Sequence, residues 1–263
     1  MSAPVFFLDP QRVAQVRPGD VVVLDGGEGK HAGVVQRLGA GEAIDLVDGL
    51  GTRLSGRVLA TDGPNVTVDV AQVRHERHDG VSLVLVQALA KGDRDDLAVE
   101  AATEVGVDEV VPWQAERSIV VWRGERAARS RSRWVATVRA ATKQSRRAWE
   151  PLVGPLAATS SLVARVREVV ATGGVALVLH ETAREPIASV ALPVPRGAGA
   201  DDDAPRREVL LVVGPEGGIS DREVAVLEEA GATTVRLGPH VLRTSTAGPV
   251  AVALLSERLG RWA

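Results

Sequence analysis

The segment Leu211-Val-Val-Gly-Pro-Glu-Gly-Gly-Ile-Ser220 reads as a buried strand that runs into a glycine-rich bend. A short amphipathic segment separates it from Leu237-Gly-Pro-His-Val-Leu-Arg-Thr-Ser-Thr246, which contains a second bend followed by polar residues. The glycines of both bends carry no Cβ, so their backbone can approach a flat ligand closely. The two segments therefore predict adjacent loops that recognise a ligand through main-chain groups.

The first bend leads into a helix. Ser220 and Glu223 have the spacing of a capping box, and Gly231 is placed to stop the helix. No Lys-Ser or Lys-Thr pair follows the glycines, and the spacing Gly-x-Gly-x-x-Gly is absent. These absences argue against the phosphate loops of nucleotide hydrolases and of dinucleotide-binding folds, so a phosphate ligand is disfavoured at this bend.

Strands and helices alternate from residue 81 to the end of the chain. Apolar runs predict strands at residues 81–89, 109–111, 175–179 and 235–237, in addition to the strand that contains Leu211. Helical spacing predicts helices at residues 95–105, in which Leu97 is expected in the core, 161–170, around Val224, and 249–261. This order predicts a parallel sheet covered by helices, with the ligand at the carboxyl ends of the strands, where His180, Gly214 and Gly238 lie.

The first 75 residues have a different pattern. Short alternating runs are separated by turn signals at Asp25-Gly26, Asp48-Gly49 and Asp62-Gly-Pro64, which is typical of a small β-barrel built from hairpins. One helix is expected between His31 and Leu38, with Gly39 as its stop. The sequence therefore predicts a separate β domain before the α/β region.

A basic helix is predicted before residue 147. Nine Lys and Arg residues lie between Arg123 and Arg147, against one acid, Glu125. Trp134, Val138 and Ala141 would form an apolar stripe on one side of this helix and leave cations on another. Such a face either binds RNA or is an ordinary solvated helix surface.

Composition limits the function classes. The chain has 263 residues, 45% of them hydrophobic, no cysteine, and a net charge of −3, so any RNA contact must come from a local patch. No apolar run approaches the roughly 20 residues of a membrane-spanning helix, and neither a signal segment nor a metal-ligand cluster is evident. A cytoplasmic protein without a metal site is expected.

Several motifs in order resemble one known family. The two glycine loops resemble the cofactor loops of the bacterial 16S ribosomal RNA uracil-N3 methyltransferases, the RsmE family of the SPOUT superfamily. The likeness extends over nearly the whole chain and includes His31-Ala-Gly-Val-Val-Gln-Arg37, Thr103-Glu-Val-Gly-Val107, Pro112, Glu116-Arg-Ser118, Gln144-Ser-Arg146 and Leu179-His-Glu181. The resemblance implies a PUA-like RNA-binding β-barrel at residues 1–75 and a SPOUT α/β domain at 76–263 that ends in a trefoil knot. Residues 196–207 are expected to form a mobile insertion.

The resemblance also implies a set of site residues. S-adenosylmethionine would lie among three loops and contact Leu179, His180, Gly214, Glu216, Gly217, Gly218, Ile219, Leu237, Gly238, Leu242, Thr244 and Thr246. The RNA would contact Arg37, Arg139, Lys143, Gln144, Arg146 and Arg147. Removal of the N3 proton leaves negative charge on the uracil, so a cation is needed near O2 or O4. Arg243 is the candidate for that role. Glu216 or Glu104 is the candidate that contacts the substrate or accepts its proton. Each of the three could instead have a purely structural role.

The expected function is the methylation of N3 of a uridine in 16S ribosomal RNA, within the small ribosomal subunit, by a homodimer. Two alternatives stay open at this point. The chain could be a catalytically silent RNA-binding assembly factor of the ribosome, or it could perform the same chemistry on another RNA. Intact glycine loops favour an enzyme, because a pure binding protein has no need of a cofactor crevice.

Overall fold

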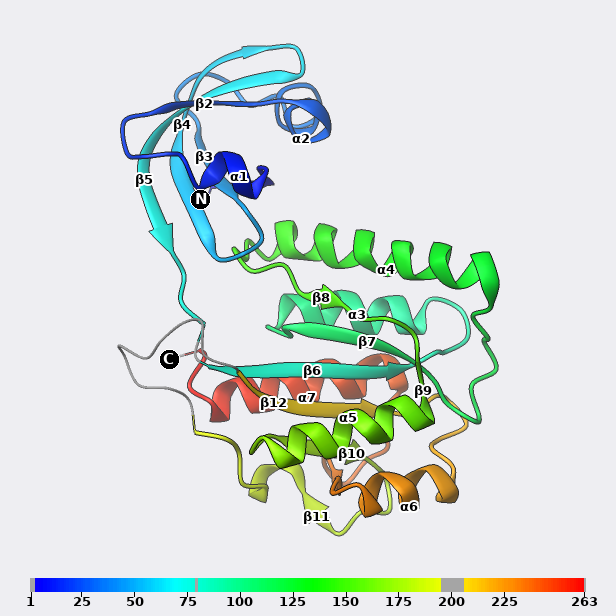
Figure 1. The fold of residues 1–263 in the computed structure, drawn as a ribbon. Coiled ribbons are helices and arrows are strands. Elements are labelled where there is room, and N and C mark those ends of the chain that lie inside the picture. The colour runs from blue at the N-terminus through cyan, green and yellow to red at the C-terminus, as the bar shows by residue number, and fades with distance from the viewer. Residues whose placement is uncertain (1–2, 79, 195–205, 263) are drawn as a thin grey trace. The chain divides into compact units, whose positions relative to one another are not determined.

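The structure, a computed structural model, describes residues 3–78, 80–194 and 206–262 of the chain. The chain divides into two compact units, Met1–His78 with Thr142–Glu150, and Asp79–Ala141 with Pro151–Ala263 (Figure 1). In this division residues 142–150 group with the first unit, whereas the sequence-based boundary after residue 75 left them in the second. Residues 196–205 of the predicted insertion at 196–207 lie outside the described residues. Its last residue, Arg207, is the first residue of a strand.

The first unit is built on a five-stranded sheet. Its strands pair in the order β1 (Val5–Phe7), β3 (Ala43–Val47), β4 (Thr52–Asp62), β5 (Asn65–His75) and β2 (Val21–Leu24), and all neighbours are antiparallel except β1 and β3. Phe6, Ile44 and Leu46 are fully buried and belong to one core, since alternate side chains of a strand point to the same face. Within the described ranges no ladder joins β1 to β2, so the sheet is open, whereas the sequence predicted a barrel.

A short helical segment packs against this sheet where the sequence predicted a helix. It consists of α2 (Gly26–Lys30) and a π-helical turn, η1 (His31–Val35). A Cβ on Gly33 would lie 2.5 Å from the carbonyl oxygen of Gly63, so the segment approaches the β4–β5 turn through its glycines. Ala32 is buried, whereas Val34 and Val35 are exposed, so only part of this segment contributes to the core of the unit.

The second unit contains a parallel sheet, as the alternation of strands and helices predicted. The path of the sheet is β11 (Glu185–Pro186), β13 (Thr233–Arg236), β10 (Val175–Leu179), β12 (Arg207–Val213), β6 (Val81–Ala88), β7 (Glu109–Gln114) and β8 (Leu152–Val153), with β9 (Ala157–Ala158) also paired to β7. Every pair in this sheet is parallel. The carboxyl ends of the strands therefore meet at one edge.

Helices cover both faces of the parallel sheet (Figure 1). Leu83 and Leu85 of β6 share one core with α3 (Arg94–Glu104), α4 (Gly124–Gln144) and α7 (Thr244–Arg258). Val84 and Val86 share the other core with α5 (Thr159–Ala171) and α6 (Asp221–Glu229). The alternation along β6 explains why this strand reads as a continuous apolar run.

Two details of the predicted helices were wrong. Leu97 is exposed, and Ala98 and Val99 occupy the core instead. Helix α7 begins at Thr244, and Pro249 lies inside it rather than at its start. A proline inside a helix gives up one backbone hydrogen bond, and sequence reasoning expects it in the first turn for that reason.

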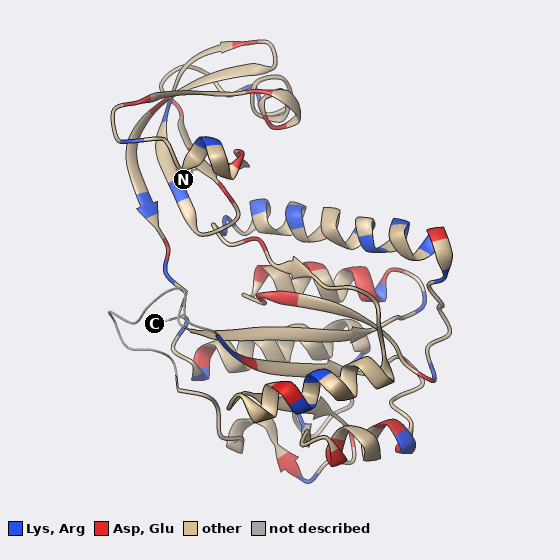
Figure 2. Cartoon of the chain, viewed as in Figure 1, with Lys and Arg blue, Asp and Glu red and all other residues tan. Residues whose placement is uncertain are grey.

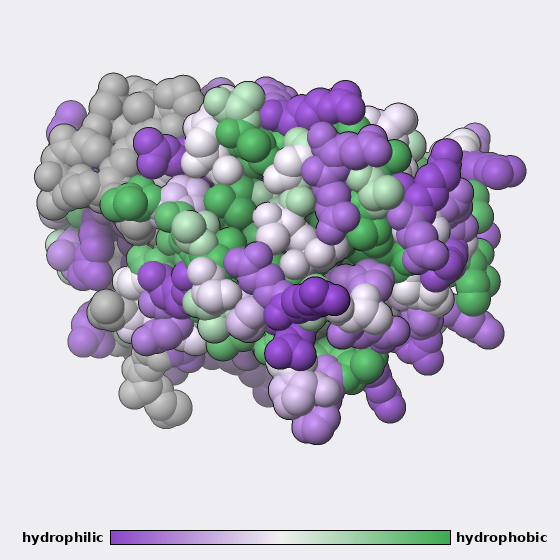
Figure 3. Space-filling model, turned by 90° about the horizontal axis from the view of Figure 1, so that it is seen from below, coloured by the Kyte–Doolittle hydropathy of each residue, from purple (hydrophilic) through white to green (hydrophobic). Residues whose placement is uncertain are grey.

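The surface of the chain mixes hydrophilic and hydrophobic side chains. Figure 3 shows apolar side chains exposed among charged and polar ones on the face that is seen from below. Single exposed apolar residues are normal on a folded protein. No helix in the described part of the chain combines the length and the apolar composition needed to cross a bilayer.

Candidate cofactor pocket and RNA-binding surface

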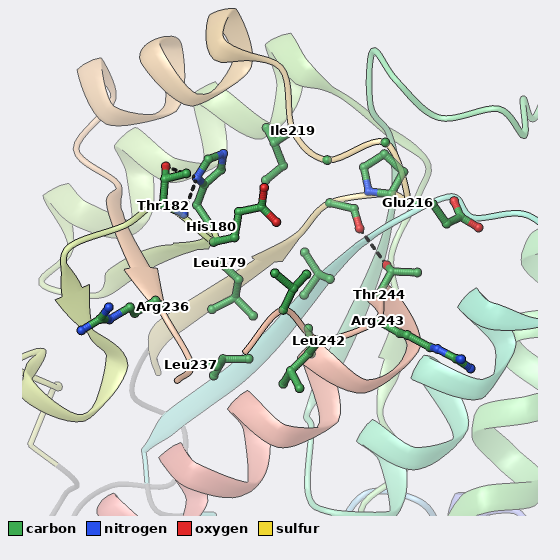
Figure 4. A pocket seen from close by; sticks show the side chains of 18 of the residues that line it. Leu179, His180, Thr182, Glu216, Ile219, Arg236, Leu237, Leu242, Arg243 and Thr244 are labelled. Carbon is green, nitrogen blue, oxygen red and sulfur yellow. Dashed lines mark hydrogen bonds between the residues drawn. The ribbon is translucent and has the colours of Figure 1, made fainter. Parts of the chain in front are cut away.

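A pocket of about 960 Å³ lies at the carboxyl edge of the parallel sheet. The loops that follow β10, β12 and β13 supply most of its lining (Figure 4). Parallel strands bring these three loops together although they are far apart in sequence. This is the crevice that the sequence predicted.

The loop after β12 is held in shape by its own residues. Gly218 has a φ of +72°, a conformation that side chains with a Cβ resist. A Cβ on Gly214 would lie 2.7 Å from Cγ1 of Ile219, so the loop closes tightly on itself. At its end, Ser220 caps α6 by accepting a hydrogen bond from the backbone N–H of Glu223, as the capping box predicted.

The loops after β12 and β13 are joined by a hydrogen bond. The hydroxyl of Thr244, the first residue of α7, donates to the carbonyl oxygen of Gly214 at 2.7 Å. The same hydroxyl accepts a hydrogen bond from the side-chain amide of the buried Gln87 at 2.8 Å. Thr244 thereby connects both glycine loops to strand β6.

One side of the pocket is apolar. Figure 4 shows the side chains of Leu179, Leu237 and Leu242 gathered between His180 and Arg243. His180 is oriented by a 2.9 Å contact between its Nδ1 and the hydroxyl of Thr182. An apolar surface with exposed backbone polar groups around it suits a flat heteroaromatic ring.

Glu216 is engaged in contacts with the loop after β6. Its Oε1 accepts hydrogen bonds from the backbone N–H of Lys91 at 2.9 Å and from Arg94 at 2.5 Å. Burial favours a higher pKa for Glu216, but hydrogen bonds from its own backbone N–H, from Arg94 and from Lys91 outweigh burial and lower the pKa. A carboxylate with a lowered pKa is a poor proton acceptor, so the geometry favours a structural role for Glu216.

Arg243 is the cationic residue at the start of α7. It is exposed, and its side chain makes no hydrogen bond or ion pair with the residues that the structure describes, although its carbonyl oxygen accepts hydrogen bonds from the backbone of Thr246 and Ala247. Its side chain extends away from the three leucines (Figure 4). A guanidinium group without a partner at the rim of a pocket is available to a ligand.

Most of the predicted site residues line this pocket. They are Leu179, His180, Gly214, Glu216, Gly217, Gly218, Ile219, Leu237, Gly238, Leu242, Arg243 and Thr244. Two others lie elsewhere, since Thr246 is exposed in the first turn of α7 and Glu104 is exposed at the end of α3, and neither lines the pocket. Sequence reasoning missed Arg94, Arg117, Asp221 and Arg236, which do line it. Arg94 and Arg117 follow β6 and β7, so the shared sheet edge was the signal that could have found them.

The predicted basic helix is α4, and Figure 2 shows Lys and Arg residues along it. Trp134, Val138 and Ala141 are buried, as the apolar stripe predicted. Arg131 donates to the carbonyl oxygens of Val153 and Gly154, so some of these cations have structural partners. The helix face is therefore only partly available to a ligand.

The predicted RNA-binding residues differ in their surroundings. The Nζ of Lys143 lies 2.6 Å from Glu28 and 4.9 Å from the centre of the Phe6 ring, and its side chain is only 16% exposed. Arg37 and Arg146 are exposed and are the two non-glycine residues with positive φ in the described ranges. Arginine rarely adopts a positive φ, and glycine or asparagine usually occupies such a position in a turn. Gln144 is exposed, whereas Arg139 and Arg147 are half-buried.

No group of three or more potential metal-ligating side chains occurs in the described segments. The pocket instead has the character of a site for an organic ligand. Its glycine backbone, its leucines and its volume fit S-adenosylmethionine, which combines an adenine ring with a charged amino-acid end.

Comparison with known proteins places these features in one family. Residues 77–256 match the RNA methyltransferase domain family. The chain is 44% identical over 267 residues to ribosomal RNA small subunit methyltransferase E of Mycobacterium bovis. The match covers 100% of this chain and 94% of that protein. The protein of that name from Bacillus subtilis is 25% identical, with 92% of each chain covered.

A solved structure supports the same assignment. Ribosomal RNA small subunit methyltransferase E of Neisseria gonorrhoeae, bound to S-adenosyl methionine, is similar with a TM-score of 0.80 and 26% identity, and 98% of each chain is covered. The match extends over both units of the chain. This chain belongs to the RNA methyltransferase family that includes the ribosomal RNA small subunit methyltransferase E proteins.

Proposed function

We propose that this protein transfers a methyl group from S-adenosylmethionine to N3 of a uridine in 16S ribosomal RNA of the small ribosomal subunit. The observation that carries the proposal is the pocket formed by the three loops after β10, β12 and β13, in a chain that is 44% identical to a ribosomal RNA small subunit methyltransferase. The N3 position rests on the resemblance to the RsmE family.

The residues of the pocket divide the work of binding the cofactor. Leu179, Leu237 and Leu242 offer an apolar surface to the adenine ring, and the backbone of residues 214–219 offers N–H and C=O groups to its edge and to the ribose. When bound, S-adenosylmethionine supplies an electrophilic methyl group on a positively charged sulfur. The loops hold this group in one orientation, which lowers the entropy cost of the transfer.

The uracil needs a proton removed from N3 and a cation near its carbonyl oxygens. As the N3–H bond breaks, negative charge spreads over O2 and O4. Arg243 is the candidate that stabilises this charge, because it lines the pocket and its guanidinium group has no partner among the described residues. Glu216 is tied to Arg94 and Lys91, and Glu104 lies outside the pocket, so we assign the proton to neither.

The family resemblance also guides the assembly that we propose. The first unit acts as a PUA-like RNA-binding domain, and Arg37, Arg139, Gln144, Arg146 and Arg147 contact the RNA. The segment from β13 to α7 passes through a loop to form a trefoil knot, as the resemblance implies. We propose that the enzyme works in the cytoplasm as a homodimer.

Mass spectrometry of ribosomal RNA tests the proposed function directly. Purified protein is incubated with S-adenosylmethionine and either naked 16S ribosomal RNA or small subunits from cells that lack the protein. We expect N3-methyluridine at one position, with the subunit as the better substrate. If titration calorimetry finds no saturable binding of S-adenosylmethionine, the catalytic proposal fails and an RNA-binding assembly factor remains.

A further inference from the structure

Arg117 reaches the tip of the cofactor loop from a separate segment. It lies in the loop after β7, and its guanidinium donates hydrogen bonds to the carbonyl oxygens of Gly217 at 3.2 Å and Ile219 at 3.5 Å. Its Cβ would be 3.3 Å from a Cβ on Gly217, so the side chain lies directly against the glycine backbone. Arg117 is exposed and lines the pocket.

The charge of Arg117 is not neutralised by these contacts. Carbonyl oxygens carry no net charge, and no carboxylate is paired with Arg117 in the described part of the chain. Arg94, which reaches the neighbouring residue of the same loop, differs because it forms an ion pair with Glu216 at 2.5 Å. Arg117 therefore presents a fixed positive charge at the mouth of the pocket.

A buried carboxylate fixes the segment that carries Arg117. Glu223 is fully buried, and its Oε1 accepts hydrogen bonds from the backbone N–H of Glu116 at 2.9 Å and from the hydroxyl of Thr159 at 2.8 Å. Its Oε2 accepts one from the backbone N–H of Ser220 at 3.2 Å. Because a buried charge is costly unless it is hydrogen-bonded, these donors hold the carboxylate in one place. Glu223 thus links residue 116 to the end of the cofactor loop.

The order of the strands places Arg117 away from the apolar side of the pocket. Leu179 ends β10 and Leu237 follows β13, and both strands lie on one side of β12. Arg117 follows β7, which lies beyond β6 on the other side. The leucines for the cofactor ring therefore lie on one side of the pocket, next to Arg236 at the end of β13, and Arg94 and Arg117 form a cationic side opposite them. A guanidinium on the cationic side suits an anionic oxygen of the second substrate.

We propose that Arg117 binds a phosphate group of the substrate RNA next to the target uridine, and that Glu223 positions Arg117 for this contact. The inference rests on the proposed function, because it assumes that RNA approaches this pocket. Guanidinium groups also bind carboxylates, so the amino-acid end of the cofactor is the competing ligand that the test must exclude.

The test measures two affinities for each variant. RNA binding is followed by fluorescence anisotropy with the 16S fragment that contains the methylated site, and cofactor binding by titration calorimetry. For Arg117→Ala we expect the Kd for RNA to rise about tenfold to a hundredfold, the range of one charge-assisted hydrogen bond, while the Kd for S-adenosylmethionine stays within about twofold. The slope of log Kd against log salt should fall by about 0.7, the value for one phosphate contact on a single strand.

Arg167 provides the matched control. It is an exposed arginine of α5 outside the pocket, so Arg167→Ala removes the same charge from the same unit. We expect this variant to keep the RNA affinity and the salt slope of the wild type. An equal loss in both variants would show a general charge effect and overturn the proposal.

The positioning role of Glu223 is tested by a double-mutant cycle. Glu223→Gln keeps the shape but cannot accept all the hydrogen bonds, so the RNA affinity should fall with little change in cofactor affinity. If Glu223 acts through Arg117, the double variant Arg117→Ala with Glu223→Gln binds RNA no more weakly than Arg117→Ala alone. Additive losses would mean that Glu223 supports the fold without positioning Arg117.

Two results would remove Arg117 from the RNA site. An unchanged Kd for RNA in Arg117→Ala excludes the contact, and a loss confined to cofactor affinity assigns Arg117 to the carboxylate of S-adenosylmethionine. Both outcomes are separate from failure of the proposed function, in which the wild-type protein leaves 16S ribosomal RNA unmethylated.

Discussion

The hydroxyl of Thr244 and the carbonyl oxygen of Gly214 are 2.7 Å apart and share a hydrogen bond across 30 residues of sequence. The bond closes one side of the pocket, because Gly214 begins the loop after β12 and Thr244 begins α7. The side-chain amide of Gln87, which is fully buried, donates a second hydrogen bond to the same hydroxyl. The two glycine loops are therefore joined to each other and to β6 through one hydroxyl group.

Thr244→Val removes this hydroxyl but keeps the branched shape of the side chain. The amide of Gln87 and the carbonyl of Gly214 then lose a buried partner, at a cost of about 1–3 kcal/mol in the free energy of unfolding. Urea denaturation measures that loss, and calorimetry should show weaker binding of S-adenosylmethionine. Thr244→Ser retains the hydroxyl and serves as the control; equal behaviour of the two variants would contradict a role for the hydrogen bonds.

Gly238→Ala tests where the cofactor lies without disturbing the loop. A Cβ on Gly238 has no neighbour within 4 Å, so the fold should tolerate it and the free energy of unfolding should stay unchanged. The added methyl group enters the pocket, where it would collide with a bound cofactor and lower its affinity by at least about tenfold. Unchanged affinity, measured by calorimetry, would place the cofactor away from this residue.

Arg243→Ala tests the proposed stabilisation of charge on the uracil. Loss of a cation or donor that acts on the developing charge typically costs about a hundredfold in kcat. The Kd for S-adenosylmethionine should change little, because the side chain of Arg243 extends away from the leucines (Figure 4). Single-turnover methylation of small subunits measures the chemical step, and a normal rate would exclude Arg243 from catalysis.

Local sequence signals identified much of the fold. Strand β10 spans Val175–Leu179, the range that its apolar run predicted, and the capping box of Ser220 and Glu223 is present. These features depend on residues that are close in sequence, so periodicity and capping rules can find them. The carboxyl edge of the sheet was predictable for the same reason, because strand order along the chain indicates a parallel sheet.

Contacts between distant residues could not be found in this way. Lys143 reads as part of a cationic helix, but its partner Glu28 lies 115 residues earlier in the chain. Arg117 is a single arginine after a strand. Its position in the pocket is known only from its contact with Gly217, which lies 100 residues later in the sequence. The open sheet of the first unit likewise depends on which strands pair at its edges.

Lys143 and Arg146 should respond differently to substitution. Lys143→Ala removes the partly buried ion pair with Glu28 and the contact with Phe6, so we expect a lower free energy of unfolding. Arg146→Gly removes an exposed side chain at a φ of +60°, which glycine adopts without strain, so stability should be kept or increased. RNA binding should nevertheless fall in the Arg146 variant. Urea denaturation and anisotropy with 16S RNA separate the two roles, and unchanged RNA affinity in Arg146→Gly would contradict the RNA contact.

Asp95 predicts a pH dependence of stability. Burial, with a smaller contribution from the neighbouring charge of Asp96, raises the pKa of Asp95 from 3.8 to about 6. The folded state therefore binds a proton more tightly than the unfolded state, so the contribution of Asp95 to stability is full below pH 3.8 and is lost as the pH rises through 6. In Asp95→Asn this loss is absent.

The variant Asp95→Asn should consequently gain stability relative to the wild type as the pH rises from about 4 to about 6.5. Its Oδ1 can still accept the hydrogen bond from the backbone N–H of Asp96, so the start of α3 is preserved. Asp93→Asn is the control, because Asp93 is exposed and makes no side-chain capping bond. Urea denaturation at several pH values measures the difference, and parallel curves for Asp95→Asn and the wild type would show that Asp95 does not titrate in this range.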